Sequence, residues 1–391
     1  MQTRRGKARA KIRAWRLMRR RLRENSLARG DGFALDRAVL GPPLWSGPQR
    51  LPPAQRRSRK TQQSFPGVVM KSEFVSRRQF IQTTAAAVAA TGLSGTLLDL
   101  RADPLGLPIG LQLYTVGSDL QKDFDGTLKK IAAIGYRSVE GASFASFQGK
   151  TPADLRKSLS DAGLKCPSAH VVQTTMTDDE MDKLIDFCHN LGLQYMVCAT
   201  TPIGPPPGPP QQGLTAEQRR AAAEDRLNKL TPDDFKKTAE VFNKVGAKIN
   251  KAGMQFAYHN HALEFKSFPD GSTGLDVLIQ NSEKGTVNYE LDCGWVVYAG
   301  HDPIALLKKY SDRIKMLHVK DEKPGYPASI GGGGAPTTEI GKGKIDWQAV
   351  FEAAKGAKIQ HYFVEQEPPF SEMPPLDAIK VSYDYLHALK A

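Results

Sequence analysis

Four short apolar runs in the C-terminal half of the chain each end in a side chain of the kind that binds metal ions. The runs cover residues 256–261 (leading to Glu264), 287–292, 314–318 and 362–365. Turn or helix-start residues follow closely behind each run, which is typical of a buried parallel strand. Helical sequence fills the segments between the runs, so this half predicts strands alternating with helices.

The same alternation begins earlier in the chain. Strands are predicted over residues 109–114, 137–140, 165–170 and 194–199. Helices are predicted over residues 120–134, 152–162 and 178–191, and then, after a Pro/Gly loop at 202–213, in helical sequence up to 252. The later helices are expected over residues 275–282, 303–310, 347–355 and 376–389. Glycines at 135, 163, 192 and 253 stand where a helix C-cap is expected before the next strand.

Eight strand–helix alternations within residues 107–391 predict a single (β/α)8 barrel, the TIM-barrel fold. A doubly wound open sheet is the competing architecture. It is less favoured because no glycine-rich phosphate turn follows the first strand.

The barrel prediction brings four distant side chains together. The C-terminal ends of all eight strands face one mouth, so Glu264, Asp292, His318 and Glu365 are expected to converge there. Three carboxylates and one imidazole form an oxygen-rich site that suits a divalent ion. We expect one such ion, Mn²⁺ first, with Mg²⁺, Co²⁺ and Zn²⁺ as alternatives.

Charge divides the chain into two parts. Residues 1–69 carry 18 basic and 3 acidic side chains, so residues 70–391 carry 36 basic and 38 acidic ones and are slightly acidic. The first part is rich in Arg, Pro and Gly and has no sustained apolar period, which predicts disorder. It is either a nucleic-acid-binding arm or, as we favour, an upstream extension of a protein that starts at Met70.

The stretch after Met70 resembles a twin-arginine export signal. Ser76-Arg77-Arg78-Gln79-Phe80-Ile81 precedes an Ala-rich apolar region at 84–98, which is too short and too weakly apolar for a spanning helix. We therefore expect a signal peptide over residues 70–102, a periplasmic or otherwise exported protein, and transient binding to the export machinery. A buried Ala-rich helix is the alternative.

Several longer motifs resemble the exported sugar phosphate isomerase/epimerase family of the xylose isomerase-like barrel superfamily. The motifs are Tyr258-His-Asn-His-Ala-Leu-Glu-Phe265, Leu291-Asp-Cys-Gly-Trp295, Leu317-His-Val-Lys-Asp321, Gly341-Lys-Gly-Lys-Ile-Asp-Trp347 and Val364-Glu-Gln-Glu367. The resemblance implies a metal site at Glu264, Asp292, His318 and Glu365. Several relatives place the first ligand within strand five, so His259 or His261 can replace Glu264.

The resemblance also implies roles in catalysis. Proton removal beside a carbonyl needs the developing negative charge stabilised, which a divalent ion on two vicinal sugar oxygens supplies. Glu264 and Glu365 inherit the role of acid and base. The expected substrate-binding residues are Glu140, His170, His259, His261, Trp295 and Lys320.

Each of these residues has a structural alternative. Glu140 and His170 can be ordinary strand-end side chains, and Trp295 can simply pack. His259 and His261 share one face if the strand continues, facing either the barrel or the helices. Lys320 can belong to a solvated turn.

Three functions follow from the sequence. The leading one is a metal-dependent isomerase or epimerase, or alternatively a lyase, acting on a small-molecule sugar, keto-sugar or cyclitol. An endonuclease IV-like hydrolase would need a basic groove, whereas the region after residue 69 is slightly acidic, so no nucleic-acid partner is expected. A non-catalytic sugar-binding barrel predicts loss of ligands. Homo-oligomerisation stays open.

Overall fold

The computed structural model describes residues 103–143, 147–204, 215–331 and 336–389. The predicted extension at 1–69 and the predicted signal at 70–102 lie outside these residues. Among the described helices, none is long and apolar enough to cross a membrane.

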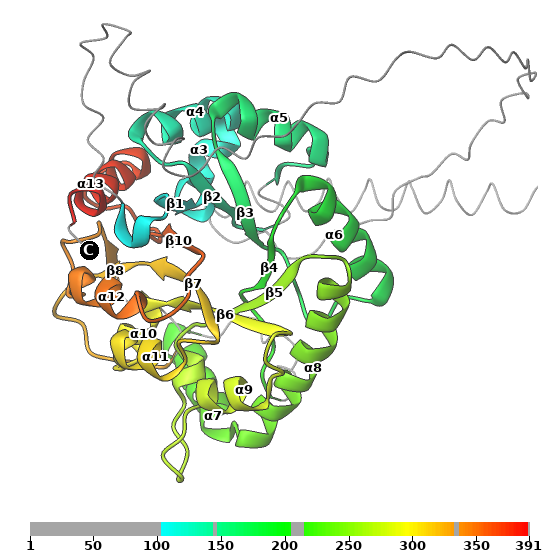
Figure 1. The fold of residues 1–391 in the computed structure, drawn as a ribbon. Coiled ribbons are helices and arrows are strands. Elements are labelled where there is room, and N and C mark those ends of the chain that lie inside the picture. Colours follow the sequence, from blue (N-terminus) through cyan, green and yellow to red (C-terminus); the bar gives the residue numbers. More distant parts are fainter. Residues whose placement is uncertain (1–102, 144–146, 205–214, 332–335, 390–391) are drawn as a thin grey trace, which may run out of the picture. The chain divides into compact units, whose positions relative to one another are not determined.

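Eight parallel strands close into a barrel in the order β1-β10-β7-β6-β5-β4-β3-β2, which confirms the predicted fold (Figure 1). The strands are β1 (Gly110–Gln112), β2 (Ser138–Gly141), β3 (Lys165–His170), β4 (Tyr195–Cys198), β5 (Gln255–His259), β6 (Val287–Asp292), β7 (Ile314–Val319) and β10 (His361–Val364).

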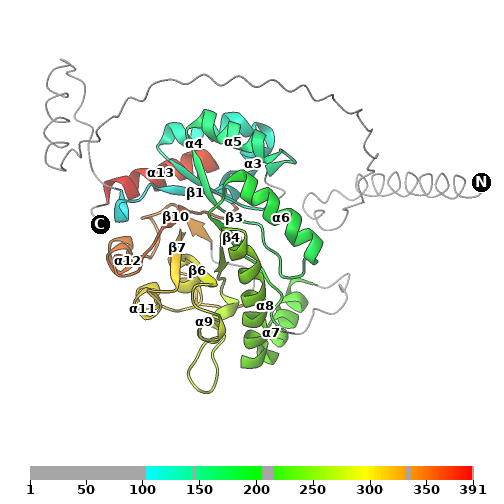
Figure 2. The same cartoon turned by 45° about the vertical axis from the view of Figure 1, so that its right-hand side comes forward.

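Helices surround the barrel, as the two views in Figures 1 and 2 show. They are α3 (Gly117–Lys122), α4 (Phe124–Ile134), α5 (Pro152–Ala162), α6 (Asp178–Leu191), α7 (Ala216–Lys229), α8 (Pro232–Lys251), α9 (Gly274–Asn281), α10 (Cys293–Tyr298), α11 (Pro303–Lys309), α12 (Trp347–Ala354) and α13 (Pro375–Ala388). Helices α5 and α6 have the predicted bounds because each starts at a capping threonine and ends at a left-handed glycine.

The first predicted helix, residues 120–134, is two helices. Asp123 separates α3 from α4 and caps α4, because its Oδ1 accepts the backbone N–H of Gly126 at 2.9 Å. The aspartate side chain bonds a backbone N–H group and so interrupts the helix at this point. Apolar periodicity does not register this interruption and therefore predicted one continuous helix.

Strand β5 also differs from its prediction. The run was expected to continue to residue 261, whereas β5 ends at His259 and a short 3-10 turn, η4 (Leu263–Phe265), follows. This turn decides where Glu264 lies.

The inside of the barrel is layered. Tyr195, Val197, Ala257, Met316 and Phe363 form a buried apolar cluster. Because strand side chains alternate, His259, His318 and Glu365 stand one level above this cluster, two residues further along their strands. The apolar layer therefore supports a polar layer at the mouth.

A two-stranded ribbon, β8 (Asp321–Glu322) with β9 (Thr337–Thr338), extends β7 past the barrel rim. The buried Asp321 carboxylate accepts the N–H groups of Gly341, Gly343 and Ile345 and the indole N–H of Trp347. This arrangement fixes the segment that follows Lys320.

Candidate metal centre

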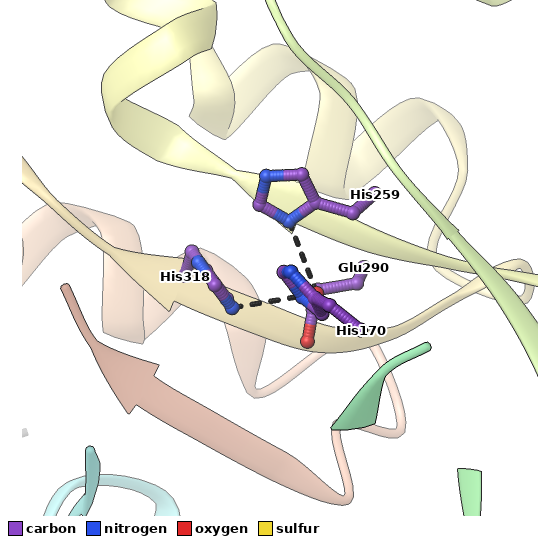
Figure 3. Close-up of side chains that lie close together, drawn as sticks. All are labelled: His170, His259, Glu290 and His318. Atoms are coloured by element: carbon purple, nitrogen blue, oxygen red, sulfur yellow. Dashed lines mark hydrogen bonds and ion pairs between the residues drawn. The ribbon is translucent and has the colours of Figure 1, made fainter. Parts of the chain in front are cut away.

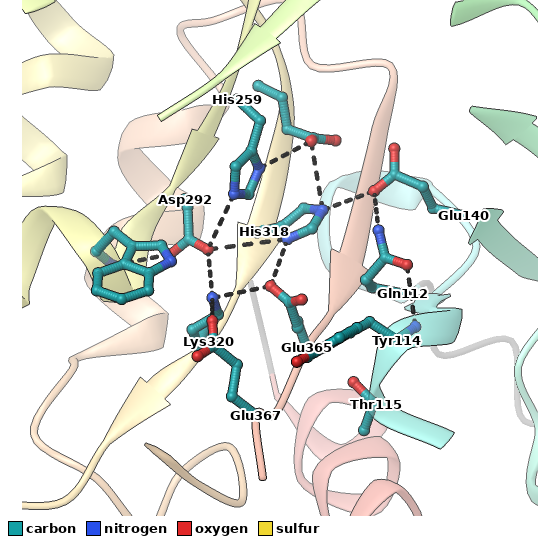
Figure 4. A network of polar contacts seen from close by, with 12 residues as sticks. Gln112, Tyr114, Thr115, Glu140, His259, Asp292, His318, Lys320, Glu365 and Glu367 are labelled. Carbon is teal, nitrogen blue, oxygen red and sulfur yellow. Dashed lines mark hydrogen bonds and ion pairs between the residues drawn. The ribbon is translucent and has the colours of Figure 1, made fainter. Parts of the chain in front are cut away.

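Three of the four predicted metal ligands lie together at the mouth of the barrel. Asp292, His318 and Glu365 each offer an atom, and these atoms all lie within 4.8 Å of one another. His318 Nδ1 is 2.9 Å from Glu365 Oε2 and 3.8 Å from Asp292 Oδ2 (Figure 4). All three side chains are buried. Each comes from the C-terminal end of a different strand.

Glu264, the fourth predicted ligand and the proposed partner in acid/base chemistry, is placed elsewhere. Its carboxylate accepts the Tyr258 hydroxyl and, at 3.0 Å, the backbone N–H of His261. Tyr258 packs on Phe242 of α8, with ring centroids 4.6 Å apart, so this contact lies on the helix side of β5. Because the chain turns after His259, Glu264 holds that turn rather than joining the grouped ligands.

His259 stands where the fourth ligand was expected. Its Nε2 is 3.7 Å from Asp292 Oδ2, and its Nδ1 is 3.0 Å from Glu290 Oε2. The ring faces the inside of the barrel and is 4.5 Å, centroid to centroid, from the ring of His318. Of the two alternatives to Glu264 left open by the sequence, His259 is therefore the one beside the other ligands.

Below these ligands lies a second set of polar side chains, which we call the inner layer: Glu140, His170 and Glu290. His170 Nε2 is 2.7 Å from Glu290 Oε2 and 3.0 Å from Glu140 Oε2. Three imidazoles converge on the one Glu290 oxygen, with His318 Nε2 at 3.4 Å (Figure 3). Glu140 contacts His318, and the His170 ring lies beside those of His259 and His318; their predicted role in substrate binding stays a prediction.

We call Asp292, Lys320, Glu365 and Glu367 the outer layer. His259 and His318 stand between the two layers, with one ring nitrogen toward each. His318 Nε2 is 2.7 Å from Glu140 Oε2, while its Nδ1 faces Glu365. Glu140 also accepts a hydrogen bond from Gln112 Nε2 at 2.8 Å, which fixes its orientation.

Two groups of described residues could hold a metal ion, and they share His318. One consists of Asp292, His318 and Glu365, and the other of His170, His259, Glu290 and His318. Glu290 and Glu140 accept from imidazole nitrogens, so those nitrogens carry the protons. The opposite nitrogen of His259 then presents a lone pair to the outer layer. His318 differs: despite burial, Glu290 and Glu365 hold its pKa well above the ordinary value, so its Nδ1 donates to Glu365 and would have to release this proton to bind a metal ion. A carboxylate that orients a ligand histidine in this way is the usual support of a metal site.

The donor set of the outer side fits a divalent ion. It offers His259 Nε2, Asp292 Oδ2, His318 Nδ1 and Glu365 Oε2, a mixture that suits Mn²⁺, Zn²⁺ or a similar ion. Asp292 Oδ2 is fully buried and accepts no hydrogen bond within the described part of the chain, although the Lys320 ammonium forms an ion pair with it. In the metal-free protein the buried Asp292 charge is therefore balanced by the Lys320 ammonium.

The charges of the two layers are strongly coupled. Burial opposes the charged form of His170, but Glu140 and Glu290 raise its pKa to about 9. Burial and the nearby His318 and His170 lower the pKa of His259, which therefore stays neutral, as a metal ligand must. Despite burial, Lys320 and His318 hold the pKa of Glu365 well below its ordinary value.

The mouth above the outer layer is partly aromatic. The rings of His261 and Trp295 lie 5.2 Å apart, and Lys320 Nζ is 5.1 Å from the centre of the Trp295 ring. Burial and the Lys320 charge lower the pKa of His261 to about 3, so this ring is neutral. Trp295 Nε1 is buried with no hydrogen-bond partner among the described residues. These groups can meet a bound small molecule.

Three residues at the site were not singled out from sequence. Glu290 lies two residues before Asp292 and Glu367 two residues after Glu365, so the period of two along a strand could have identified both. Tyr114 follows β1 and has a half-exposed side chain. Burial and the charges of Glu367 and Glu365 raise its pKa.

The chain belongs to the xylose isomerase-like TIM barrel family, whose model matches residues 128–389. An inosose dehydratase from Clostridium perfringens is 26% identical over 64% of this chain and 86% of its own length. An inosose dehydratase from Geobacillus kaustophilus is 24% identical over 50% of this chain, and the match spans 61% of that relative.

Solved structures give a similar result. A crystal structure of a sugar phosphate isomerase/epimerase from Parabacteroides distasonis has a TM-score of 0.55 and 26% identity, over 72% of this chain and 94% of that one. An L-ribulose 3-epimerase is 14% identical with a TM-score of 0.50, which shows a shared fold only. The family and its sugar isomerase/epimerase neighbours confirm the resemblance to the xylose isomerase-like barrels, while export stays a prediction.

Proposed function

We propose that this protein is a metal-dependent isomerase or epimerase that removes a proton from the carbon beside the carbonyl of a sugar, keto-sugar or cyclitol. The observation that carries the proposal is the set of four donor atoms, from His259, Asp292, His318 and Glu365, on the mouth side of two buried histidines. Their other nitrogens already contact carboxylates.

A divalent ion held by these four residues would supply Lewis acidity and orientation to two neighbouring oxygens of the substrate. Glu365 is the carboxylate we assign as the base. Its Oε2 lies 2.9 Å from both His318 Nδ1 and Lys320 Nζ, so its charge is stabilised and its position is fixed. In the metal-free protein its low pKa keeps it ionised at neutral pH.

His261 and Trp295 are the groups we assign to the substrate. His261 is neutral, because burial and the Lys320 charge lower its pKa to about 3, so its ring can form a hydrogen bond with a substrate oxygen. The unpaired Trp295 Nε1 can donate to a sugar hydroxyl, and its ring can lie against the apolar face of a sugar. Glu264 keeps no role in this scheme.

A lyase is the second candidate, and a specific observation favours it. The curated relatives of this chain include inosose dehydratases, whose name describes elimination of water from a keto-cyclitol. Proton removal beside a keto group is common to both outcomes. They differ in whether a proton returns to the carbon or a group leaves from the next one.

Export is part of the proposal. The twin-arginine-like sequence at 76–81 supports a periplasmic or otherwise exported enzyme, and an exported enzyme would meet neutral sugars or keto-glycosides rather than free sugar phosphates. Expression of a Met70-start gene with fractionation tests this directly. Replacement of Arg77 and Arg78 by lysine should retain the protein in the cytoplasm.

The activity is tested by metal analysis of the purified chain, followed by deuterium wash-in from heavy water across neutral ketoses, keto-glycosides and inososes. The expected result is about one divalent ion per chain and metal-dependent exchange at the carbon beside the carbonyl. Absence of bound metal after incubation with Mn²⁺, Co²⁺ and Zn²⁺ would overturn the proposal.

A further inference from the structure

Lys320 is a buried cation in the middle of the outer layer. Its side chain is 3% exposed, and its Nζ lies 2.9 Å from Asp292 Oδ2, 2.9 Å from Glu365 Oε2 and 2.7 Å from Glu367 Oε1 (Figure 4). The three carboxylates come from β6 and from the segment after β10. The ammonium therefore binds two of the carboxylates assigned to the metal and one that is not.

The Lys320 ammonium and the proposed metal ion would bind the same carboxylate oxygens. Asp292 Oδ2 and Glu365 Oε2 are the carboxylate oxygens that His259 Nε2 and His318 Nδ1 face, and both are already paired with Lys320. A divalent ion on these oxygens would stand within a few ångströms of a full positive charge in a buried site, where repulsion is strong. The ammonium and the metal ion therefore cannot both bind these two oxygens closely.

We propose that Lys320 is an internal competitor of the metal ion, and that metal binding transfers its ammonium from Asp292 and Glu365 to Glu367. This inference rests on the proposed function, because it uses the same metal site. It assigns Lys320 and Glu367 a coupled role that neither the relatives nor the fold specifies.

Glu367 is positioned to bind the displaced Lys320 ammonium. Thr337 holds the Glu367 backbone from both sides: its Oγ1 accepts the Glu367 N–H at 2.9 Å and donates to the Glu367 carbonyl at 2.9 Å. The Glu367 carboxylate is 30% exposed, whereas that of Asp292 is fully buried. An ammonium that keeps only the Glu367 contact therefore lies further toward the mouth.

The aliphatic part of the Lys320 side chain is fixed by packing, whereas its ammonium group can move. Gly294 of α10 packs against it so closely that an added Cβ would lie 2.9 Å from Lys320 Cγ. The Trp295 ring lies beside the ammonium at 5.1 Å. Metal loading would thus place a positive charge beside the substrate, where it can bind a keto oxygen or a hydroxyl. The lysine would reach the substrate only when the metal is present.

The test is Mn²⁺ affinity measured by calorimetry on the full chain after chelation. Lys320→Met removes the competing charge and should tighten Mn²⁺ binding by about tenfold or more. The same change should lower the melting temperature of the metal-free protein, because buried carboxylates lose their cation. Lys323→Met is the matched control, since Lys323 pairs with Glu372 at 2.7 Å. It should leave the affinity unchanged.

Glu367→Gln gives a second and opposite test. It removes the acceptor of the displaced ammonium, so Mn²⁺ binding should weaken, while Glu372→Gln should not change it. In the Lys320→Met background the effect of Glu367→Gln should shrink, which a double-mutant cycle measures.

Unchanged or weaker Mn²⁺ binding by Lys320→Met, or an effect of Glu367→Gln that is the same in both backgrounds, would overturn the inference. These outcomes leave the proposed function standing, because that function is tested separately, by metal binding and deuterium exchange of the wild-type chain.

Discussion

His259 and His318 divide the site into two layers of nearly the same composition and different purpose. The inner layer is closed to solvent: Glu140 and Glu290 have no exposed surface, and imidazole nitrogens face Glu140 Oε2 and Glu290 Oε2, while Glu290 Oε1 has no hydrogen-bond partner among the described residues. The outer layer has an excess of carboxylates around one lysine, and Glu367 reaches solvent. The difference shows how similar residues take different roles. Carboxylates paired with imidazoles orient the ligand histidines, whereas carboxylates in excess of the nearby cations are free to bind a metal ion.

The largest effect is expected in the outer layer. Glu365→Gln is nearly isosteric and should keep the fold, while turnover falls about 10²–10⁴-fold at saturating metal because the assigned base is lost. The measurement is solvent deuterium exchange at the carbon beside the carbonyl.

Glu264→Gln is the matched comparison for this change. Glu264 was the other glutamate expected in acid/base chemistry, and it lies on the helix side of β5. The Glu264→Gln variant should retain solvent deuterium exchange at saturating metal, while its melting temperature falls. If the two variants behaved in the reverse way, Glu264 would be the base and the layer comparison would be wrong.

A second contrast uses two neighbours on β6. Asp292→Asn removes a donor atom and should weaken Mn²⁺ binding by more than about a hundredfold, whereas Glu290→Gln removes only support and should cost about 10–100-fold. Titration of the chelated protein with Mn²⁺ measures both. A larger loss for Glu290→Gln than for Asp292→Asn would exchange the roles of the layers.

The smallest effect concerns pH. The pKa of His170 is raised to about 9, because Glu140 and Glu290 outweigh the opposing effect of burial, and the ordinary value is about 6.5. The folded protein thus holds this proton more tightly than the unfolded chain. The resulting stability is complete below about pH 6.5 and disappears as the pH rises toward 9.

The melting temperature of the metal-free protein should therefore fall across this window. In His170→Gln the fall should be shallower, since one of the raised groups is gone. A slope identical to that of the wild type would mean that His170 is not charged in the folded protein.

The barrel could be predicted from sequence because its signals are local. Alternation of apolar runs with amphipathic segments, and glycines after helices, determine α5, α6, β3 and β6 to the residue. Helix α10 and the β8–β9 ribbon escaped this reasoning, because α10 is a short continuation of the Asp292 turn and the ribbon depends on the buried Asp321 contacts.

The site was predictable where a ligand ended a strand, as at Asp292, His318 and Glu365. Glu264 was misplaced because β5 ends in a local turn, in which the Glu264 carboxylate accepts the Tyr258 hydroxyl and the His261 backbone N–H, and the apolar run alone does not show this turn. Glu140, His170 and Glu290 of the inner layer lie within strands, and their contacts with one another depend on how the strands pair in the barrel.

One spacing pattern marks the whole outer layer and one residue of the inner layer, Glu290. Four strand ends carry polar residues two apart: His259 and His261, Glu290 and Asp292, His318 and Lys320, Glu365 and Glu367. Within β6 the strand period of two places Glu290 and Asp292 on the same face, whereas the second members of the other three pairs lie beyond the ends of β5, β7 and β10.

The most direct test of the account is anomalous diffraction from crystals of the Mn²⁺-loaded protein, because it locates the ion relative to the two nitrogens of His318. We predict a single peak on the Nδ1 side, within bonding distance of His259, Asp292 and Glu365. A peak on the Nε2 side, among His170 and Glu290, would contradict the assignment of support to the inner layer and of chemistry to the outer one.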